Sequence, residues 1–388
     1  MIISLYYGTT TTEVSETSRV VGPVVVAADQ IRRAVAVNRF GHAVWGWLGD
    51  GATVADVVDG LDAGAGLVVV GRTFDLAGLA GAGVGLWRVG VRVGSVDADV
   101  AAAAALPGGL GLVVAEYASA EAAGFSPMVA GFADEVRGAC GAGTRTALVF
   151  GSGPVSATAV RNLDARGIDV LAPASDFAGG VAASVAQCVR SDRADGLVAT
   201  VVADAGGVCL GLAYSSPASL AYALAHRVGA FHSRSRGGLW VKGATSGATQ
   251  RLLRVDRDCD NDTLRFTVVQ EHPGFCHNNT RTCFGPDNGI TALYATLKQR
   301  KLGAPPGSYS ARLFNDQSLL HAKIREEAQE LCDANEKDHV AAEAADLLYF
   351  ALVKCVASGI DLADVEAHLD ARASKISRRP GNAKPAFL

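Results

Sequence analysis

Six potential metal ligands are concentrated in residues 258–283. They are three thiols and three carboxylates: Cys259, Cys276, Cys283, Asp258, Asp260 and Asp262. Three soft sulfur ligands suit zinc and leave its fourth position for water, which is the arrangement of a catalytic rather than a structural site. On an extended segment the three aspartates share one side, where hard oxygen ligands suit magnesium or calcium. The stretch therefore predicts two metals of different hardness and a hydrolytic reaction.

Each feature alone has an ordinary interpretation. An isolated DxDxD is typical of a solvated turn, and cysteines of globular proteins are usually buried thiols. However, Cys259 lies between two aspartates and is not an ordinary apolar strand position, and a disulfide leaves one of the three cysteines unpaired. The EF-hand pattern is absent, since neither its glycine at position six nor its glutamate at position twelve is present. Metal binding is the better interpretation.

A glycine-punctuated segment before this stretch combines cations with hydroxyl groups. Alternation along a strand places Arg234 and Arg236 on one face and Ser233 and Ser235 on the other. Arginine forks and hydroxyl donors suit phosphate oxygens. A solvated basic loop is the alternative, and the position next to the metal ligands favours a phosphate-bearing ligand. The candidate substrate-binding residues are Ser233, Arg234, Ser235, Arg236, Lys242, Thr245 and Ser246.

The segments FHSRSRGGLWVKGATSG, DCDND and CHNNTRTCF resemble phosphoribosyl-AMP cyclohydrolase of histidine biosynthesis, over residues 191–285. The resemblance implies a small β-rich domain that forms a homodimer. It implies that the three cysteines hold zinc, with one cysteine and the other pair contributed by different subunits, and that the three aspartates bind magnesium. The implied substrate is a phosphoribosyl nucleotide.

Opening the purine ring between N1 and C6 requires hydroxide to attack C6. Zinc generates this nucleophile near neutral pH by lowering the pKa of its bound water. His277, next to Cys276, is the catalytic candidate that moves protons to or from the water or N1. The alternative is a histidine that only orients a metal ligand.

The chain after residue 287 has helical periodicity. We expect helices over residues 290–301, 317–334, 339–358 and 362–377, and a linker with two prolines over residues 300–314. Acidic residues three apart share one face on each long helix, and a turn at 335–338 makes these helices antiparallel. Four carboxylates can thus surround magnesium: Glu327, Glu330, Glu343 and Asp346. A charged face is usually only solvated, but the second pair interrupts the apolar AAEAADLLYFALV, where burial without a cation is costly.

LKQRKLGAPPGSYSARLF, KIREEAQEL and EAADLLYFAL resemble the all-α nucleotide pyrophosphohydrolases, in particular phosphoribosyl-ATP pyrophosphatase, over residues 290–388. The resemblance implies that the four carboxylates bind magnesium for cleavage between the α and β phosphates, with Glu327 also catalytic and Glu326 a further candidate ligand. Four cations are candidates to offset the substrate's charge: Lys298, Arg300, Lys323 and Arg379.

Residues 1–188 alternate apolar β-branched runs with helical stretches. This pattern predicts an α/β domain with mostly parallel strands, either an open sheet or a partial barrel. Strands are expected over residues 20–27, 67–70, 89–93, 112–115, 147–150 and 168–171. Residues 151–153 read as a strand-to-helix turn because no Walker lysine or full GxGxxG is present. His42, near Trp45 and Trp47, reads as a packing residue, so we assign no activity to this half.

We therefore expect a multidomain protein. Residues 1–188 form an α/β domain without an assigned role, residues 189–286 a central β-rich α+β cyclohydrolase domain, and residues 287–388 an all-α pyrophosphohydrolase domain. The product of the last domain is the substrate of the central one. The arrangement resembles the front part of the fungal multifunctional histidine-biosynthesis protein.

Other function classes fit poorly. A formal charge of −4 argues against a nucleic-acid partner, and the paired CxxC knuckles of a zinc ribbon are absent. A cytidine-type deaminase needs HxE and PCxxC, which are also absent. A catalytically dead scaffold predicts lost ligands, whereas every expected ligand is in place. No run approaches the roughly 18 apolar residues of a membrane span, and the eight scattered cysteines form no disulfide framework, so we expect a reducing, cytoplasmic setting.

Overall fold

The computed structural model describes residues 3–6, 20–38, 42–96, 103–119, 123, 126–150, 154–271, 274–378 and 381. The chain divides into two compact units, which are Met1–Cys283 with Ala373–Leu388, and Phe284–Arg372. The expected turn at residues 151–153 and the candidate Arg379 lie outside the described residues. The expected boundary after residue 188 falls within the first unit and stays a prediction.

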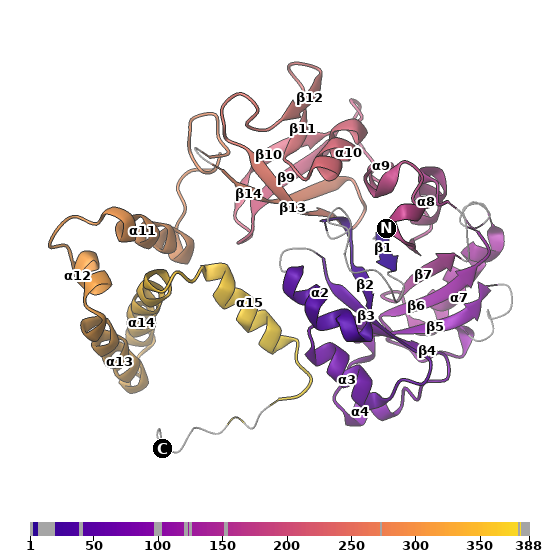
Figure 1. Ribbon diagram of the computed structural model, residues 1–388, viewed down its shortest axis with the longest axis horizontal. Helices are drawn as coiled ribbons and strands as arrows, with labels where there is room; N and C mark the ends of the chain where they lie inside the picture. The colour runs from indigo at the N-terminus through magenta and orange to yellow at the C-terminus, as the bar shows by residue number, and fades with distance from the viewer. Residues whose placement is uncertain are drawn as a thin grey trace. The chain divides into compact units, whose positions relative to one another are not determined.

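The first unit begins with a closed barrel of eight parallel strands in chain order (Figure 1). The strands are β1 Ile3–Tyr6, β2 Val24–Ala27, β3 Val44–Gly49, β4 Leu67–Gly71, β5 Val89–Ser95, β6 Leu112–Tyr117, β7 Arg145–Phe150 and β8 Ile168–Leu171. The helical elements between and after them are η1 Ala28–Gln30, α2 Ile31–Val37, α3 Val54–Asp62, α4 Gly78–Gly81, η2 Leu86–Arg88, α7 Pro127–Cys140, α8 Ala157–Asp164, η3 Ala174–Asp176 and α9 Gly180–Ala186. The expected α/β domain with parallel strands is confirmed, but the sheet is neither open nor a partial barrel, because β8 pairs with β1 and closes it.

Side-chain alternation divides the barrel into an inner and an outer apolar layer. Along β6, Leu112 and Val114 belong to the inner cluster, whereas Val113 and Ala115 belong to the outer one. Both faces of such a strand are buried, which explains why these strands read as continuous apolar runs. The helices that cover the outside start from ordinary signals, such as the capping box at the N-terminus of α3.

The rest of the first unit is built on a four-stranded sheet in the order β10-β9-β14-β13, with a separate β11-β12 hairpin (Figure 1). Its elements are β9 Val198–Asp204, β10 Cys209–Ser215, α10 Pro217–His226, β11 Ala230–Ser233, β12 Gly238–Val241, β13 Gln250–Arg257 and β14 Thr263–Gln270. Strands β9 and β10 form an antiparallel hairpin. Strand β14 runs parallel to β9 and antiparallel to β13.

Two expectations of extended backbone are wrong. Residues 234–237 form a turn between β11 and β12, so the serines and arginines do not alternate on a strand. Ser233 Oγ accepts hydrogen bonds from the amide and Nε of Arg236, both at 3.3 Å, and this closes the turn. Residues 258–262 form the loop between β13 and β14, where Asn261 has a φ of 68°.

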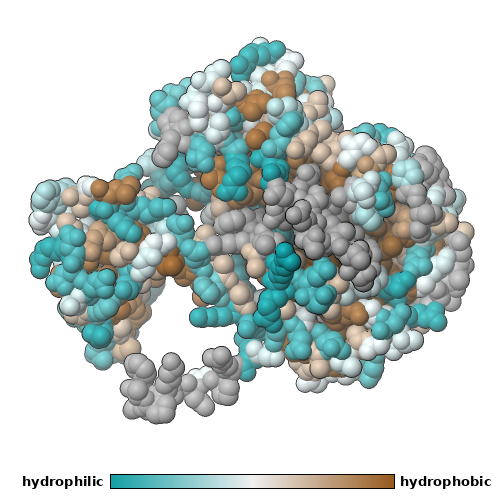
Figure 2. Space-filling model, in the orientation of Figure 1, coloured by the Kyte–Doolittle hydropathy of each residue, from teal (hydrophilic) through white to brown (hydrophobic). Residues whose placement is uncertain are grey.

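The second unit is helical, with α11 Gly289–Gly303, α12 Tyr309–Asn315, α13 Gln317–Asp333, α14 Lys337–Ala357 and α15 Leu362–Ala373. Its core is made of Leu297, Leu313, Leu320, Phe350, Leu352, Val353 and Val356. On the face seen in Figure 2, hydrophilic side chains cover most of this unit, as amphipathic helices with one buried stripe require. The expected linker over residues 300–314 is wrong, because α12 begins after the prolines with Ser308 as its N-cap.

The residues after α15 bind to the barrel. The Asp62 carboxylate accepts the amides of Ile376 at 2.7 Å and Ser377 at 3.2 Å, and Arg88 donates to the carbonyl of Ser374. We call residues 374–378 the anchor segment. The expected helix to residue 377 ends earlier, because these amides bond to Asp62 instead of to helical carbonyls.

Among the described helices, none has the length and apolar character needed to cross a membrane.

Candidate metal and substrate sites

The three aspartates converge in the β13–β14 loop. One carboxylate oxygen each of Asp258, Asp260 and Asp262 lies within 4.8 Å of the others. Asp258 Oδ1 accepts the amides of Asp262 and Thr263, both at 3.1 Å, which fixes the loop. Burial raises the pKa of Asp258, but hydrogen bonds from Thr263 and Asp262 outweigh it and leave this pKa below its usual range. A group of three hard oxygens at this spacing fits a magnesium ion.

Two of the three cysteines lie together at the opposite end of β14. The Cys283 amide donates to the Leu210 carbonyl at 2.8 Å, and the Cys283 thiol donates a hydrogen bond to the Cys276 sulfur. His277 Nδ1 lies 3.9 Å from Cys276 Sγ. Hydrogen bonds from the Asn278 amide and the Thr280 hydroxyl lower the pKa of Cys276. Burial and the neighbouring Cys276 raise the pKa of Cys283.

Cys259 lies far from this pair within one chain. It precedes β14, whereas Cys276 follows it, and the register places Thr263 beside the start of β9 and Val268 beside its end. A strand of this length spans roughly 23 Å. Two thiolates on one zinc are only about 4 Å apart, since each Zn–S bond measures about 2.3 Å. Among the described residues, no group of three close ligands includes a cysteine. The three thiols of one chain therefore do not fit one zinc ion.

Lys242 is the predicted substrate residue that lies beside the thiol pair. Its side chain is buried, which lowers its pKa, while the thiols of Cys283 and Cys276 act to raise it. Its Nζ lies 5.4 Å from the centre of the Phe275 ring. Gly243 next to it has a φ of 80°, and a Cβ there would approach the Ala248 carbonyl carbon to 2.3 Å. Only glycine allows this turn, which sets the direction of the lysine.

The other predicted substrate residues are not brought to the thiols by any recorded contact. Ser233, Ser235 and Arg236 bond to one another within their turn. The Arg234 guanidinium lies over the Tyr214 ring, 4.1 Å from its centre. Thr245 and Ser246 lie in the turn that follows Lys242.

The carboxylates of the helical unit also converge. Ligand oxygens of Glu327, Glu343 and Asp346 lie within 4.8 Å of one another, and Glu327 shares a second such group with Glu326 and Glu330. Glu327 is 5% exposed. Burial, followed by the charges of Glu327, Glu343 and Glu326, raises the pKa of Glu330. Such crowding of negative charge is what a divalent cation relieves.

Two basic residues contact these acids. Lys323 Nζ lies 2.7 Å from Glu327 and 2.8 Å from Glu326, so the further candidate ligand Glu326 shares this lysine with Glu327. His339 Nε2 lies 3.1 Å from Glu343. The sequence analysis missed His339, although its position one helical turn before Glu343 is a signal that would have found it.

Comparison with known families assigns both regions. The family model of phosphoribosyl-AMP cyclohydrolase matches residues 211–285, and that of phosphoribosyl-ATP pyrophosphohydrolase matches residues 290–373. The resemblance to both families is thus confirmed. Neither model extends into residues 1–210.

Two individual relatives are histidine biosynthesis proteins. A histidine biosynthesis bifunctional protein of Schizosaccharomyces pombe is 53% identical over 198 residues, which are 51% of this chain and 47% of that protein. The histidine biosynthesis bifunctional protein HisIE of Deinococcus radiodurans is 39% identical over 197 residues, 46% of this chain and 90% of that protein. The chain thus spans about half the length of the yeast relative. A triosephosphate isomerase of Bartonella henselae, with 16% identity and a TM-score of 0.31 over 46% of this chain and 94% of its own, is too distant to inform function.

Proposed function

Since the chain belongs to the family of histidine biosynthesis bifunctional proteins, we propose that it is a hydrolase with two consecutive activities. Residues 290–373 cleave phosphoribosyl-ATP to phosphoribosyl-AMP and pyrophosphate, and residues 211–285 open the adenine ring of phosphoribosyl-AMP. The observation that carries the proposal is that each matched region contains its own group of converging ligands.

In the pyrophosphohydrolase region, the ligands proposed for magnesium are Glu327, Glu330, Glu343 and Asp346. Magnesium supplies charge neutralisation for the triphosphate and a more acidic water. Glu327 is buried and held by Lys323 at 2.7 Å, which fixes its carboxylate towards the other acids. We assign it the role of orienting the attacking water and accepting its proton. Lys323 offsets negative charge as pyrophosphate leaves.

In the cyclohydrolase region, the ligands proposed for zinc are Cys276 and Cys283 of one chain and Cys259 of a second copy. The distance along β14 supports this sharing, because one chain keeps Cys259 at the other end of the strand. A homodimer follows as a requirement of the site. Zinc supplies a hydroxide near neutral pH. His277 moves the proton between the water and N1 of the base, and its position 3.9 Å from Cys276 Sγ supports this role.

Three further residue groups complete the proposal. The loop acids Asp258, Asp260 and Asp262 hold magnesium. Lys242, with Thr245, Ser246 and the turn of residues 233–236, binds the phosphoribosyl end of the substrate. The division into domains of residues 1–188, 189–286 and 287–388 and the cytoplasmic setting belong to the same proposal.

The test is to give the purified full chain phosphoribosyl-ATP with magnesium and zinc and to follow pyrophosphate and the ring-opened product together. Cys276→Ala abolishes ring opening and keeps pyrophosphate release, and Glu343→Ala does the opposite. If zinc-replete protein releases pyrophosphate while phosphoribosyl-AMP persists, the cyclohydrolase assignment is wrong. If either variant loses both activities, the two sites are not independent.

A further inference from the structure

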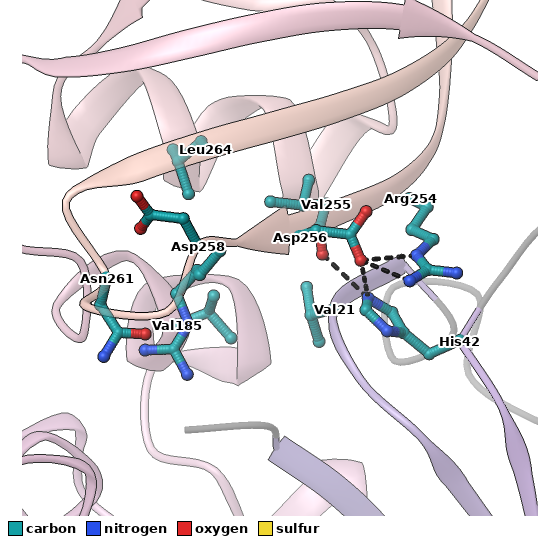
Figure 3. A pocket seen from close by; sticks show the side chains of 10 residues that line it. Val21, His42, Val185, Arg254, Val255, Asp256, Asp258, Asn261 and Leu264 are labelled. Atoms are coloured by element: carbon teal, nitrogen blue, oxygen red, sulfur yellow. Dashed lines mark hydrogen bonds and ion pairs between the residues drawn. The ribbon is translucent and has the colours of Figure 1, made fainter. Parts of the chain in front are cut away.

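The barrel meets the central sheet along strand β13, and a pocket of about 290 Å³ lies at this junction. Figure 3 shows side chains from both sides of it. Val21 and His42 come from the barrel, and Arg254, Val255 and Asp256 come from the end of β13. The loop that carries Asp258, Cys259, Asp260 and Asp262 begins at the edge of this pocket. Contacts across the junction therefore act on the strand that leads into the loop.

The first contact fixes the backbone of β13. His42 Nε2 donates to the Val255 carbonyl at 2.8 Å, and Figure 3 shows this ring directed at β13. The same nitrogen lies 3.9 Å from Asp256, which also bonds to Arg254 at 2.7 Å. Burial, with the nearby charge of Arg254, lowers the pKa of His42. A neutral histidine with its proton on Nε2 suits the bond to the carbonyl.

The second contact fixes the residue next to the metal ligands. Arg257 Nη1 donates to both oxygens of Asp164, the last residue of α8, at 3.1 and 3.2 Å. Both side chains are nearly inaccessible, at 11% and 1% exposed. Removing one partner of a buried pair of this kind is costly, because it leaves an uncompensated charge without water. Arg257 is bonded through its backbone to Asp258, so its position sets where the loop begins.

The third contact holds the loop itself. The Arg190 amide, between α9 and β9, donates to the Asn261 carbonyl at 3.0 Å. Asn261 lies between two of the aspartates and has the left-handed φ of 68° on which the loop's shape depends. Two contacts from the barrel thus reach the incoming strand and the residue before the loop, and the connection between α9 and β9 holds the tip of the loop.

We propose that the barrel positions the 258–262 loop for metal binding, with Asp164 and His42 as positioning residues. None of the described residues on the barrel side of the junction is a proposed ligand. The barrel limits the movement of the carboxylates and of Cys259, which the partner subunit needs at a fixed place. Metal sites depend on such support, because ligands held in place by their surroundings bind with a smaller loss of freedom. This inference rests on the proposed cyclohydrolase function, and it assigns the barrel a role in that reaction.

The test uses the full chain with Asp164→Asn, which keeps the shape of the side chain and removes its charge. We expect ring opening to fall at least 10-fold, with more magnesium needed for half of the maximal rate, while pyrophosphate release is unchanged. In metal-free protein, hydrogen exchange of residues 258–263 accelerates at least 10-fold, and exchange of strand β6 is unchanged. Asp134→Asn is the matched control, because it removes an exposed carboxylate of α7 that pairs with Arg137.

His42 provides an independent and milder test. His42→Leu removes the donor to Val255 and is expected to accelerate exchange of the loop, whereas His42→Gln keeps a donor and restores slow exchange and ring opening. Unchanged loop exchange in both Asp164→Asn and His42→Leu overturns the proposal. Accelerated exchange throughout the barrel also overturns it, since the residues are then needed only for folding. If wild-type protein opens no ring, the proposed function fails, and exchange in the metal-free protein still decides the positioning.

Discussion

Glu343→Gln in the helical unit separates metal binding from stability. The ligand oxygens of Glu327, Glu343 and Asp346 lie within 4.8 Å of one another. At 4.8 Å two unit charges repel by about 0.9 kcal/mol even in water, so the neutral amide relieves two such repulsions. Lys323 and His339 already offset part of this. We expect a net gain of about 1 kcal/mol in the metal-free protein, or a rise of about 4–8 °C in the melting temperature of this unit.

Magnesium is expected to make the wild-type unit more stable than the variant. At a concentration 100 times its Kd, magnesium stabilises the wild-type unit by about 2.7 kcal/mol, whereas the variant lacks a ligand and gains little. Pyrophosphate release falls more than about 100-fold, and ring opening from supplied phosphoribosyl-AMP is unchanged. The variant is therefore more stable without magnesium and inactive with it.

The two units are separable by spectroscopy. All four tryptophans lie before residue 284, so their fluorescence reports the first unit. Both units contribute to the helical signal in circular dichroism, so a melting transition that is seen in circular dichroism and not in fluorescence reports the second unit. Melting curves are compared in chelator and in saturating magnesium. Glu366→Gln, on the exposed side of α15, is the control and is expected to change neither curve. A variant that melts below wild type in chelator, or that magnesium stabilises as much as wild type, refutes the reasoning.

Three further outcomes are expected. In zinc-free protein, the alkylation rate of each cysteine is measured against pH by mass spectrometry. The midpoint is expected below the ordinary thiol pKa at Cys276 and above it at Cys283, since a thiolate forms at lower pH where the pKa is lowered. The reverse order contradicts these pKa directions. Gly243→Ala combines a φ of 80° with a backbone overlap, and we expect it to lower the free energy of unfolding by about 3 kcal/mol or more. Gly247 has a φ of 74° with open space around it, so Gly247→Ala is expected to lower this free energy by about 1 kcal/mol. Equal losses exclude the overlap as the cause. Asp62→Ala removes the acceptor of the anchor segment and accelerates tryptic cleavage there about 10-fold, and an unchanged rate shows that other contacts hold the segment.

The sequence predicts elements best where local signals agree. Helix α10 begins where Ser216 caps it and Pro217 occupies its first turn, two signals that are adjacent in the sequence. Strand β3 escaped detection, since its two glycines and two tryptophans lack the β-branched run that marks the other strands. Helix α12 was hidden by the prolines before it. Those prolines lie between the end of α11 and the start of α12, and the residues after Ser308 form the new helix.

Site residues, too, are predicted best where local spacing fixes their geometry. Carboxylates on α13 and α14 were expected together because helical spacing and an antiparallel pair fix their geometry. The loop aspartates do converge, but through hydrogen bonds to Asp258 rather than by strand alternation. No local pattern places Lys242 beside the thiols, because that contact depends on how the β12 turn packs against Phe275. The separation of Cys259 from Cys276 likewise depends on sheet order.

Two arginine–carboxylate pairs lie against the tryptophans of the barrel. Arg145 pairs with Asp169 and lies over the Trp45 ring, 4.7 Å from its centre. One layer further along the strands, Arg92 pairs with Glu116 and lies over Trp47.

In both layers the arginine pairs with a carboxylate and lies over an aromatic ring, and the Arg92–Glu116 pair is solvent-accessible, with side chains 37% and 45% exposed. Asp164 and His42, in contrast, direct their polar atoms away from the barrel and onto β13. These two contacts join the barrel to the strand that leads into the metal loop, and they are where substitution in the barrel is expected to affect catalysis.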